Sequence, residues 1–431
     1  VFVCGARGSG KCLAGDTLIT LEDGRVIPIK ELENENAKIF GLNHGLKVEA
    51  LNKQGFFRRT VNKILKVRLR SGKEITLTHE HPLLTVEGWK QAQELEKGSR
   101  IATPRILPAF GNARTTDSQV KLLAYLIAEG HLSNHFVLFS NTDKKIQNEF
   151  FESVYEFDKN LKIKEHSKPN CFRVSAIKKE VDISNVVRNE KGQFTSDGFI
   201  VAQKNNLAKW VETFGLYGKL STKKFIPSEF LQLNKEQLSL FLNRLFSCDG
   251  TIHRINKGKN WSTGYASSSK QLIFQVQNLL LRFGVLSKLR NKLIKKNGKT
   301  FKGFEIVIYG ENVLKFISEI GFFGAKEKKQ EIAFLEMSGL KRNPNTDTVP
   351  KEVWNQFKVE SWTKLGRAIG YSSPKSLHNT VKYAPSREKL LKLAQVEQNK
   401  GVELLAQSDV FWDEIIETTE NRCVALCIET R

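Results

Sequence analysis

The feature that most constrains the fold is a pattern that occurs twice in the chain. Leu122–Gly130 and Leu242–Gly250 each consist of an apolar segment that ends in a small residue, an acid and a glycine. The spacing of the apolar residues predicts a helix for each copy, and Asn234 is placed to cap the second helix. Two such helices can pack side by side, which would bring the terminal acids Glu129 and Asp249 together. We therefore predict a pseudo-twofold domain with both acids at its centre.

Paired acids suggest a metal-dependent reaction. Two neighbouring carboxylates repel each other unless a cation lies between them. Hard oxygen ligands suit Mg²⁺, so Glu129 and Asp249 are candidate metal ligands and catalytic residues. The duplicated pattern resembles that of the LAGLIDADG homing endonucleases with two motifs, which often lie inside inteins. The resemblance implies an α+β fold in which the metal activates water and one acid serves each strand of DNA.

A further segment is similar to the same family. Lys223–Pro227 resembles its K-x-I-P segment, which makes Lys224 the candidate catalytic lysine. This lysine would polarise or deprotonate the attacking water. The glycine after each acid is expected to end its helix. Two alternatives stay open: each acid could be an ordinary helix-terminal residue that faces solvent, and the endonuclease could be catalytically dead.

The first residues contain a phosphate-binding loop that is interrupted. Gly5–Lys11 matches the pattern G-x-x-x-x-G-K, which requires a following Ser or Thr to bind Mg²⁺. The next residue is instead Cys12, and a segment with alternating apolar residues and a turn at Asp23-Gly24 follows it. A helix should begin here in a nucleotide-binding protein. We therefore predict that the loop belongs to a host protein and that an insertion begins at Cys12.

Four segments, in the same order, resemble the sequence blocks of inteins, which are self-splicing elements of the Hedgehog/intein fold. They are Cys12–Ile19, Gly72–Thr85, Glu87–Lys90 with Ile101–Arg105, and Gln407–Ile415. Together these segments are similar to inteins found in replicative DNA helicases. The resemblance implies a mainly-β splicing domain and a P-loop ATPase as the host. Alternating and β-branched residues also predict short strands at residues 19–21, 26–29, 61–70 and 74–78.

The resemblance also implies a role for three residues. The thiol of Cys12 attacks the carbonyl of Lys11 and converts the peptide bond into a thioester, without a cofactor. The peptide nitrogen is a poor leaving group, and the imidazole of His81 would protonate it. Thr78 would orient the scissile peptide or stabilise the oxyanion. The alternative is that Cys12 is a small buried apolar residue and that His81 has a structural role.

Two departures from the family limit the expected reaction. The family ends in a His-Asn pair that is followed by a second nucleophile, whereas the sequence given stops at Arg431. The aspartate of the preceding block falls at Ala425. We therefore expect thioester formation without ligation of the flanking segments. We also expect the chain to be a fragment, or part of a split or degenerate element.

Charge and cysteine content agree with a DNA-binding protein of the cytoplasm. The net charge is +22 and the isoelectric point is near 9.6. This excess points to nucleic acid, although surplus lysine can also be a solvated surface. The six cysteines are scattered, with no C-x-x-C pair for zinc or redox chemistry. No leader or membrane-spanning stretch is predicted.

A helix-turn-helix pattern is predicted near the C-terminus. Leu365–Tyr371 and Ser372–Leu377 have the composition of two short helices joined by a small-apolar-Gly turn. Lys375, Asn379 and Lys382 are candidate DNA-binding residues, which would face phosphates or base edges. A plain three-helix packing unit is the alternative.

These patterns divide the chain into five parts. They are a host P-loop remnant (1–11), the N-terminal half of the splicing domain (12–110), a LAGLIDADG homing endonuclease (115–340), a helix-turn-helix-like helical segment (348–398) and the C-terminal part of the splicing domain (402–431). The expected partners are double-stranded DNA at the intein-less site of the host gene and the flanking host polypeptide, with the chain as a monomer and no membrane.

Two other functions compete with splicing and DNA cleavage. A P-loop ATPase is rejected for this chain because no Walker B strand follows Lys11, and a non-catalytic DNA-binding remnant stays open.

Overall fold

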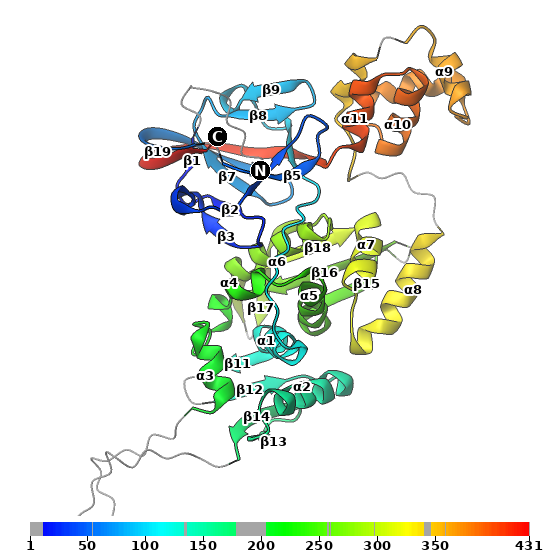
Figure 1. The fold of residues 1–431 in the computed structure, drawn as a ribbon. Coiled ribbons are helices and arrows are strands. Elements are labelled where there is room, and N and C mark those ends of the chain that lie inside the picture. The colour runs from blue at the N-terminus through cyan, green and yellow to red at the C-terminus, as the bar shows by residue number, and fades with distance from the viewer. Residues whose placement is uncertain are drawn as a thin grey trace, which may run out of the picture.

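The computed structural model of the chain contains three parts (Figure 1). The described residues are 12–53, 55–132, 136–177, 204–256, 258, 260–296, 298–339, 346–357 and 359–430. We call residues 12–107 with 410–430 the β domain, residues 117–339 the α/β domain, and residues 346–409 the helical segment. The expected host remnant, residues 1–11, lies outside the described residues. Within the described part of the chain, no helix has the length and apolar character needed to cross a membrane.

The β domain is built from both ends of the chain. Its elements are β1 (Leu13–Ala14), β2 (Leu18–Thr20), β3 (Val26–Pro28), η1 (Ile29–Asn34), β4 (Ile39–Leu42), β5 (Val48–Leu51), β6 (Phe56–Leu69), β7 (Glu74–Leu77), β8 (Pro82–Thr85), β9 (Gly88–Gln91), η2 (Ala92–Glu94), β10 (Arg100–Pro104) and β19 (Val410–Thr430). The main sheet has the strand order β1-β7-β6-β19-β10. The long strand β19 pairs with β10, β6 and β1, so the C-terminal strand joins the N-terminal half in one sheet.

Alternation of residue types explains why β6 forms part of this sheet. Leu65, Val67 and Leu69 are buried, while Lys66 and Arg68 between them point outward. Successive side chains of a strand lie on opposite faces, so one face of β6 packs into the core. The predicted strands at residues 19–21, 26–29, 61–70 and 74–78 all correspond to observed strands, with shifted ends.

The α/β domain consists of two halves with the same order of elements. The first half contains α1 (Asp117–Glu129), β11 (Gly130–Leu132), β12 (Val137–Ser140), α2 (Lys144–Phe157), β13 (Leu161–Glu165), β14 (Cys171–Ala176) and α3 (Asn206–Thr213). The second half contains α5 (Lys235–Asp249), β15 (Gly250–Arg254), β16 (Trp261–Ser267), α6 (Lys270–Arg282), β17 (Lys288–Lys296), β18 (Lys299–Tyr309) and α7 (Glu311–Glu319). Three further short elements and one helix complete the domain: η3 (Ser221–Lys223), α4 (Ser228–Leu231), η4 (Gly324–Lys326) and α8 (Glu327–Ser338).

The two halves share one apolar core around α1 and α5. Their sheets have the equivalent orders β11-β12-β14-β13 and β15-β16-β18-β17. Helices α1 and α5 pack against each other, and their apolar residues belong to one continuous cluster. Asn234 caps α5 as predicted, because its side-chain oxygen accepts a hydrogen bond of 2.9 Å from the N–H of Gln237. The predicted duplication is therefore present in the arrangement of the elements.

The helical segment packs on the β domain. It contains η5 (Lys351–Gln356), α9 (Trp362–Ala368), η6 (Pro374–Lys382), α10 (Arg387–Val396) and α11 (Lys400–Gln407). Its apolar residues form one cluster with Val86, Ala102 and Trp412 of the β domain. Helix α11 extends this segment beyond the predicted boundary at residue 398. The second helix of the predicted helix-turn-helix is a 3-10 helix, η6, rather than an α-helix.

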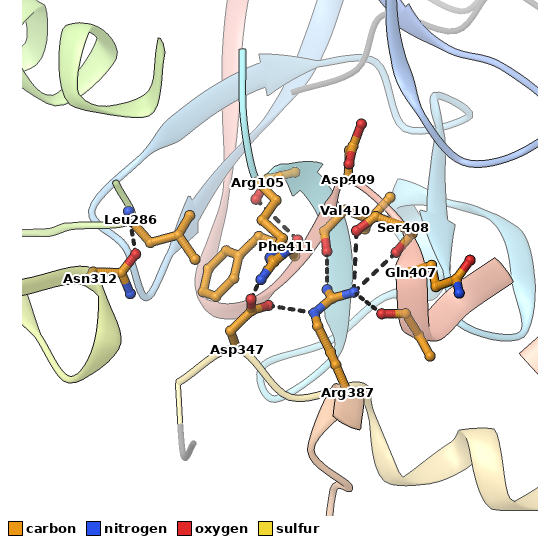
Figure 2. A network of polar contacts seen from close by, with 12 residues as sticks. Arg105, Leu286, Asn312, Asp347, Arg387, Gln407, Ser408, Asp409, Val410 and Phe411 are labelled. Atoms are coloured by element: carbon orange, nitrogen blue, oxygen red, sulfur yellow. Dashed lines mark hydrogen bonds and ion pairs between the residues drawn. The ribbon is translucent and has the colours of Figure 1, made fainter. Parts of the chain in front are cut away.

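An ion-pair network fixes the helical segment to the β domain (Figure 2). Asp347 accepts a hydrogen bond of 2.8 Å from Arg387 and another from Arg105, which follows β10. The remaining nitrogens of Arg387 donate to the carbonyl oxygens of Leu405, Ala406, Ser408 and Val410. The ion pair between Asp347 and Arg387 therefore connects three segments: the residue after β10, the start of the helical segment and the start of β19.

Candidate functional sites

Two hydrogen bonds join Cys12 and Thr78, which are both predicted site residues. The N–H of Cys12 donates a hydrogen bond of 3.1 Å to the hydroxyl oxygen of Thr78. The N–H of Thr78 in turn donates to the carbonyl oxygen of Cys12 at 3.0 Å. Cys12 directly precedes β1 and Thr78 directly follows β7, and these two strands are paired through Leu13 and Leu77. The sheet therefore holds the peptide nitrogen of Cys12 against a hydroxyl group.

His81 lies on the same loop, between β7 and β8. The backbone N–H of His81 donates a hydrogen bond of 3.1 Å to the carbonyl oxygen of Thr78, and only 2% of the residue is exposed. His79 differs, because 24% of its side chain is exposed and it lies 3.8 Å from Glu420. The structure therefore places His81, rather than His79, in the interior beside Thr78. The predicted scissile bond involves Lys11, which lies outside the described residues.

The C-terminal strand also reaches this site. Strand β19 pairs with β1 in the register Leu13–Ile428 and Ala14–Cys427. The backbone after Cys12 is thus flanked by β7 on one side and by the end of β19 on the other. Residues that follow β19 along a polypeptide would leave the sheet close to Cys12.

The second predicted site lies at the C-terminal ends of α1 and α5. Glu129 is the last residue of α1 and Asp249 is the last residue of α5. Burial, followed by the negative charge of Asp249, raises the pKa of Glu129 to about 7, although a 2.6 Å hydrogen bond from the amide of Asn141 opposes this shift. Burial also raises the pKa of Asp249 to about 6. The two acids therefore share a poorly solvated centre, as the duplicated pattern predicts.

The glycines after the two acids end their helices as predicted, although not through a left-handed turn. Gly130 and Gly250 have φ angles of −73° and −74°, so neither adopts the left-handed conformation that commonly ends helices. A Cβ atom on Gly130 would lie 2.4 Å from the carbonyl oxygen of Leu126, and one on Gly250 would lie 2.3 Å from that of Phe246. Glycine is required here because the chain turns into a strand directly against the last helical turn.

Two lysines bind the ends of these helices in equivalent ways. Nζ of Lys224 donates to the carbonyl oxygens of Leu126, Ile127 and Gly130, at 2.9, 2.9 and 2.6 Å. Nζ of Lys326 donates to those of Phe246, Ser247 and Cys248, at 3.1, 2.5 and 2.8 Å. A cation at a helix C-terminus is stabilised by the helix dipole. The charges of both lysines also oppose the rise in the pKa of Asp249.

The sequence of the α/β domain matches a known family. The LAGLIDADG-like domain family matches residues 236–321, which run from α5 into the segment after α7. Over nearly the whole chain, two replicative DNA helicases are similar. The DnaB helicase of Nostoc sp. (strain PCC 7120) is 30% identical over 95% of this chain and 46% of its own length. That of Rhodothermus marinus is 28% identical over 95% of this chain and 43% of its own length.

A solved intein decides the family. The crystal structure of a DnaB intein from Synechocystis sp. PCC 6803 is 32% identical, and the match covers 70% of that chain and 22% of this one. The chain belongs to the intein family. The TM-score of this match is 0.21, so the assignment rests on sequence identity. This intein also contains a LAGLIDADG-like domain, matched over residues 236–321. It spans less than half the length of the curated helicases that it matches.

Sequence reasoning missed two polar residues of the intein's acidic centre. Lys326 lies in a segment without a K-x-I-P pattern, and Asn141 follows a strand in an ordinary polar turn. No feature of the sequence distinguishes either residue. Lys224 was found, but all three of its N–H bonds point to carbonyl oxygens. Burial lowers the pKa of Lys224 to about 8, so the side chain is mostly a charged ammonium group near neutral pH. Whether it polarises or deprotonates water stays a prediction.

The acidic centre fits a hard divalent cation. Mg²⁺ is commonly held by one or two carboxylates together with water and substrate phosphates. Glu129 and Asp249 provide two carboxylates whose pKa values are raised by burial, and a cation between them would favour their charged forms. Among the described residues, no group of three or more His, Cys, Asp or Glu side chains forms a complete metal cage. An ion held by this pair would need further ligands from elsewhere.

The three predicted DNA-binding residues of the intein lie on η6. Lys375, Asn379 and Lys382 are all exposed, whereas Leu377 of the same element is buried in the core of the helical segment. Gly366 of α9 approaches η6 closely, because a Cβ atom there would lie 2.9 Å from Pro374. The two short helices are thus tightly packed, with one cationic face of η6 directed outward.

Proposed function

We propose that the β domain of this intein performs the first step of protein splicing, an N–S acyl shift at Cys12, and that the α/β domain cuts double-stranded DNA at the intein-less site of the host gene. The observation that supports the splicing half is the reciprocal hydrogen bonding of Cys12 and Thr78. It fixes the peptide nitrogen that must become the leaving group. Relatives of similar sequence are replicative helicases, which suggests a P-loop ATPase host in the cytoplasm.

The acyl shift requires three groups to act on one peptide bond. The thiol of Cys12 loses its proton, its sulfur attacks the carbonyl carbon of Lys11, the C–S bond forms, and the C–N bond breaks, so one proton passes in net from sulfur to nitrogen. The released nitrogen must gain a proton, and the imidazole of His81 is the proposed donor. Thr78 accepts a hydrogen bond from this same N–H group, which favours its orienting role over a role as an oxyanion donor. The negative oxygen would need other donors.

A thiol test distinguishes this function from a buried structural cysteine. Dithiothreitol attacks thioesters, so incubation of the chain should release residues 1–11 at the Lys11–Cys12 bond. Cys12→Ala should abolish the release. His81→Ala should slow it by roughly 100-fold, within the range of general acid catalysis. Mass spectrometry of the released segment measures both effects, and an intact wild-type chain after prolonged incubation contradicts the proposal.

The endonuclease half rests on the paired carboxylates. Glu129 and Asp249 would hold Mg²⁺, which supplies an activated water and neutralises the scissile phosphates when bound. Lys224 would keep positive charge near the phosphate. The raised pKa values of the two acids mean that both become fully charged only above neutral pH or beside a cation. The resulting chemistry is hydrolysis of one phosphodiester bond in each strand.

A plasmid that carries the uninterrupted host P-loop sequence tests this half. Wild-type chain with Mg²⁺ should linearise it, and a plasmid with the interrupted sequence should stay intact. Tight binding without any nicking would instead assign the chain to the non-catalytic DNA-binding remnants. We further propose that Lys375, Asn379 and Lys382 contact DNA as a monomer binds it. Replacing both lysines by alanine should weaken binding and reduce its dependence on salt.

A further inference from the structure

Helix α6 of the α/β domain contacts the β domain through three side chains. The amide nitrogen of Gln277 donates to the carbonyl oxygen of Ser71 at 3.0 Å. The amide nitrogen of Asn278 donates to the hydroxyl oxygen of Thr20 at 3.0 Å. Arg282 donates to the carbonyl oxygen of Gly24 at 2.7 Å. Figure 1 shows α6 beneath the hairpin of β2 and β3.

The Ser71 contact lies on the turn that sets the register of β7. The carbonyl oxygen of Ser71 also accepts a hydrogen bond of 2.8 Å from the N–H of Leu289 in the α/β domain. The backbone N–H of Ser71 donates a hydrogen bond of 3.1 Å to the side chain of the buried Asp413. A shift of one residue in this turn would turn the side chains of β7 to the opposite face. Thr78 follows β7 directly, so its contact with Cys12 depends on this register.

The Thr20 and Gly24 contacts lie on the hairpin that follows Cys12. Hydrogen bonds from Thr17 to Ala14 and from Lys30 to Gly15 connect this hairpin to β1. Arg282 is only 1% exposed, and burial lowers its pKa to about 10. Its other hydrogen bonds go to the carbonyl oxygens of Ala109 and Leu231 and to the side-chain oxygen of Asn278.

The other side of α6 supports the acidic centre. The side chain of Gln275 bonds both the N–H and the carbonyl oxygen of Ile226, at 2.8 and 2.7 Å. Ser269, the N-cap of α6, donates to the carbonyl oxygen of Lys224 at 2.6 Å. Helix α6 therefore binds the segment around Lys224 on one side. On the other side it binds the β6–β7 turn and the β2–β3 hairpin, which adjoin the Cys12 site.

We propose that Gln277, Asn278 and Arg282 are positioning residues for the acyl shift at Cys12, although they belong to the endonuclease domain. The proposal rests on the proposed function of the β domain. The residues act by holding the β6–β7 turn and the β2–β3 hairpin at fixed places on α6. The distance between the Cys12 and Thr78 segments is then set from outside the domain that reacts.

Gln277 and Gln275 form a matched pair for the test. At saturating dithiothreitol, the rate of leader release equals the rate of the acyl shift, whereas at low thiol it also reflects capture of the thioester. Gln277→Ala should lower the saturating rate about fivefold to tenfold, which corresponds to the loss of one or two hydrogen bonds. DNA cleavage should be unchanged. Gln275→Ala should leave the saturating rate unchanged and reduce DNA cleavage.

A double-mutant cycle checks the second contact independently of folding defects. Thr20→Val removes the hydroxyl partner, and Asn278→Ala removes this contact together with the bond from Arg282. Each should lower the saturating rate, Asn278→Ala at least as much as Thr20→Val, and the double variant should be no slower than Asn278→Ala alone. Thr20→Ser, which keeps the hydroxyl, should restore the wild-type rate. Additive effects, or equal rates for Gln277→Ala and wild type, would overturn the positioning role. Absence of leader release from wild type would instead overturn the proposed function itself.

Discussion

The two halves of the α/β domain end their central helices alike, but the two ends are not equivalent. Each has an acid, a glycine that a Cβ atom would crowd, and a lysine bound to three carbonyl oxygens. The first end differs because Lys224 is 6% exposed and Asn141 binds its acid. At the second end, Lys326 is more exposed. A duplicated pattern therefore determines the geometry of a centre, while the electrostatics of each half depend on its own neighbours.

The largest expected effect comes from removal of the acids. Asp249→Asn and Glu129→Gln should each reduce DNA cleavage by at least about 100-fold, because each removes one of two carboxylates that would hold the cation. If the halves serve different strands, each variant should nick one strand slowly and leave the other intact. Labelling each strand of a short duplex separately measures this difference. Equal loss on both strands would show that the two acids act on one shared step.

Replacement of Lys224 and of Lys326 should lower the free energy of unfolding by different amounts. Lys224→Met leaves three carbonyl oxygens of a deeply buried helix end without a donor, so we expect the free energy of unfolding to fall by about 2–4 kcal/mol. Lys326→Met should cost about 1–2 kcal/mol, since water can reach the more exposed end of α5. Urea unfolding followed by circular dichroism provides both values. Equal losses would contradict the inferred difference in burial.

The pH dependence should also reveal the unequal acids. The folded-state pKa values of Glu129 and Asp249, about 7 and about 6, lie above the ordinary carboxyl range. Stability from a raised carboxyl pKa is complete below the unfolded pKa and is lost as pH rises through the folded pKa. Without metal, the melting temperature of wild type should therefore fall between pH 5 and pH 8 relative to that of Glu129→Gln, by about 2 °C.

Added Mg²⁺ provides the control for that experiment. A cation bound between the acids stabilises the charged forms, so Mg²⁺ should raise the melting temperature of wild type at pH 8 and have little effect on Glu129→Gln. The difference between the two proteins should then become nearly independent of pH. A Mg²⁺ effect that is the same in both proteins would indicate that the ion binds elsewhere.

The sequence could predict the architecture where a pattern recurs or where local chemistry is specific. The two helices, the N-cap at Asn234 and the strands of the N-terminal half followed from periodicity and turn residues. The pairing of Cys12 with Thr78 followed from a resemblance to inteins, since residues so far apart in sequence give no local signal of contact. The prediction that Gly130 ends its helix is confirmed, but the sequence could not give its conformation, because a crowded helix end and a left-handed turn both select glycine.

Other parts of the structure depend on tertiary contacts that leave no local trace. Lys326 binds α5 only because η4 brings it back to that helix end. Helix α11 lies beyond the predicted boundary at residue 398 and extends into the stretch predicted as the C-terminal part of the splicing domain. The place of α6 between the two sites likewise arises from the docking of two domains, and its sequence indicates only an apolar helix face.

The smallest expected effect concerns Asn141, the polar neighbour found at one end only. Its amide opposes the rise in the pKa of Glu129, so Asn141→Ala should raise that pKa further. DNA cleavage that needs a charged Glu129 should then move its acidic limb to higher pH, with a loss of about threefold at pH 7 and little loss at pH 9. The variant Asn141→Leu, which keeps a branched side chain but has no amide, should behave in the same way. A uniform loss at every pH would mean that Asn141 acts through packing, and the two helix ends would then be electrostatically closer than the structure indicates.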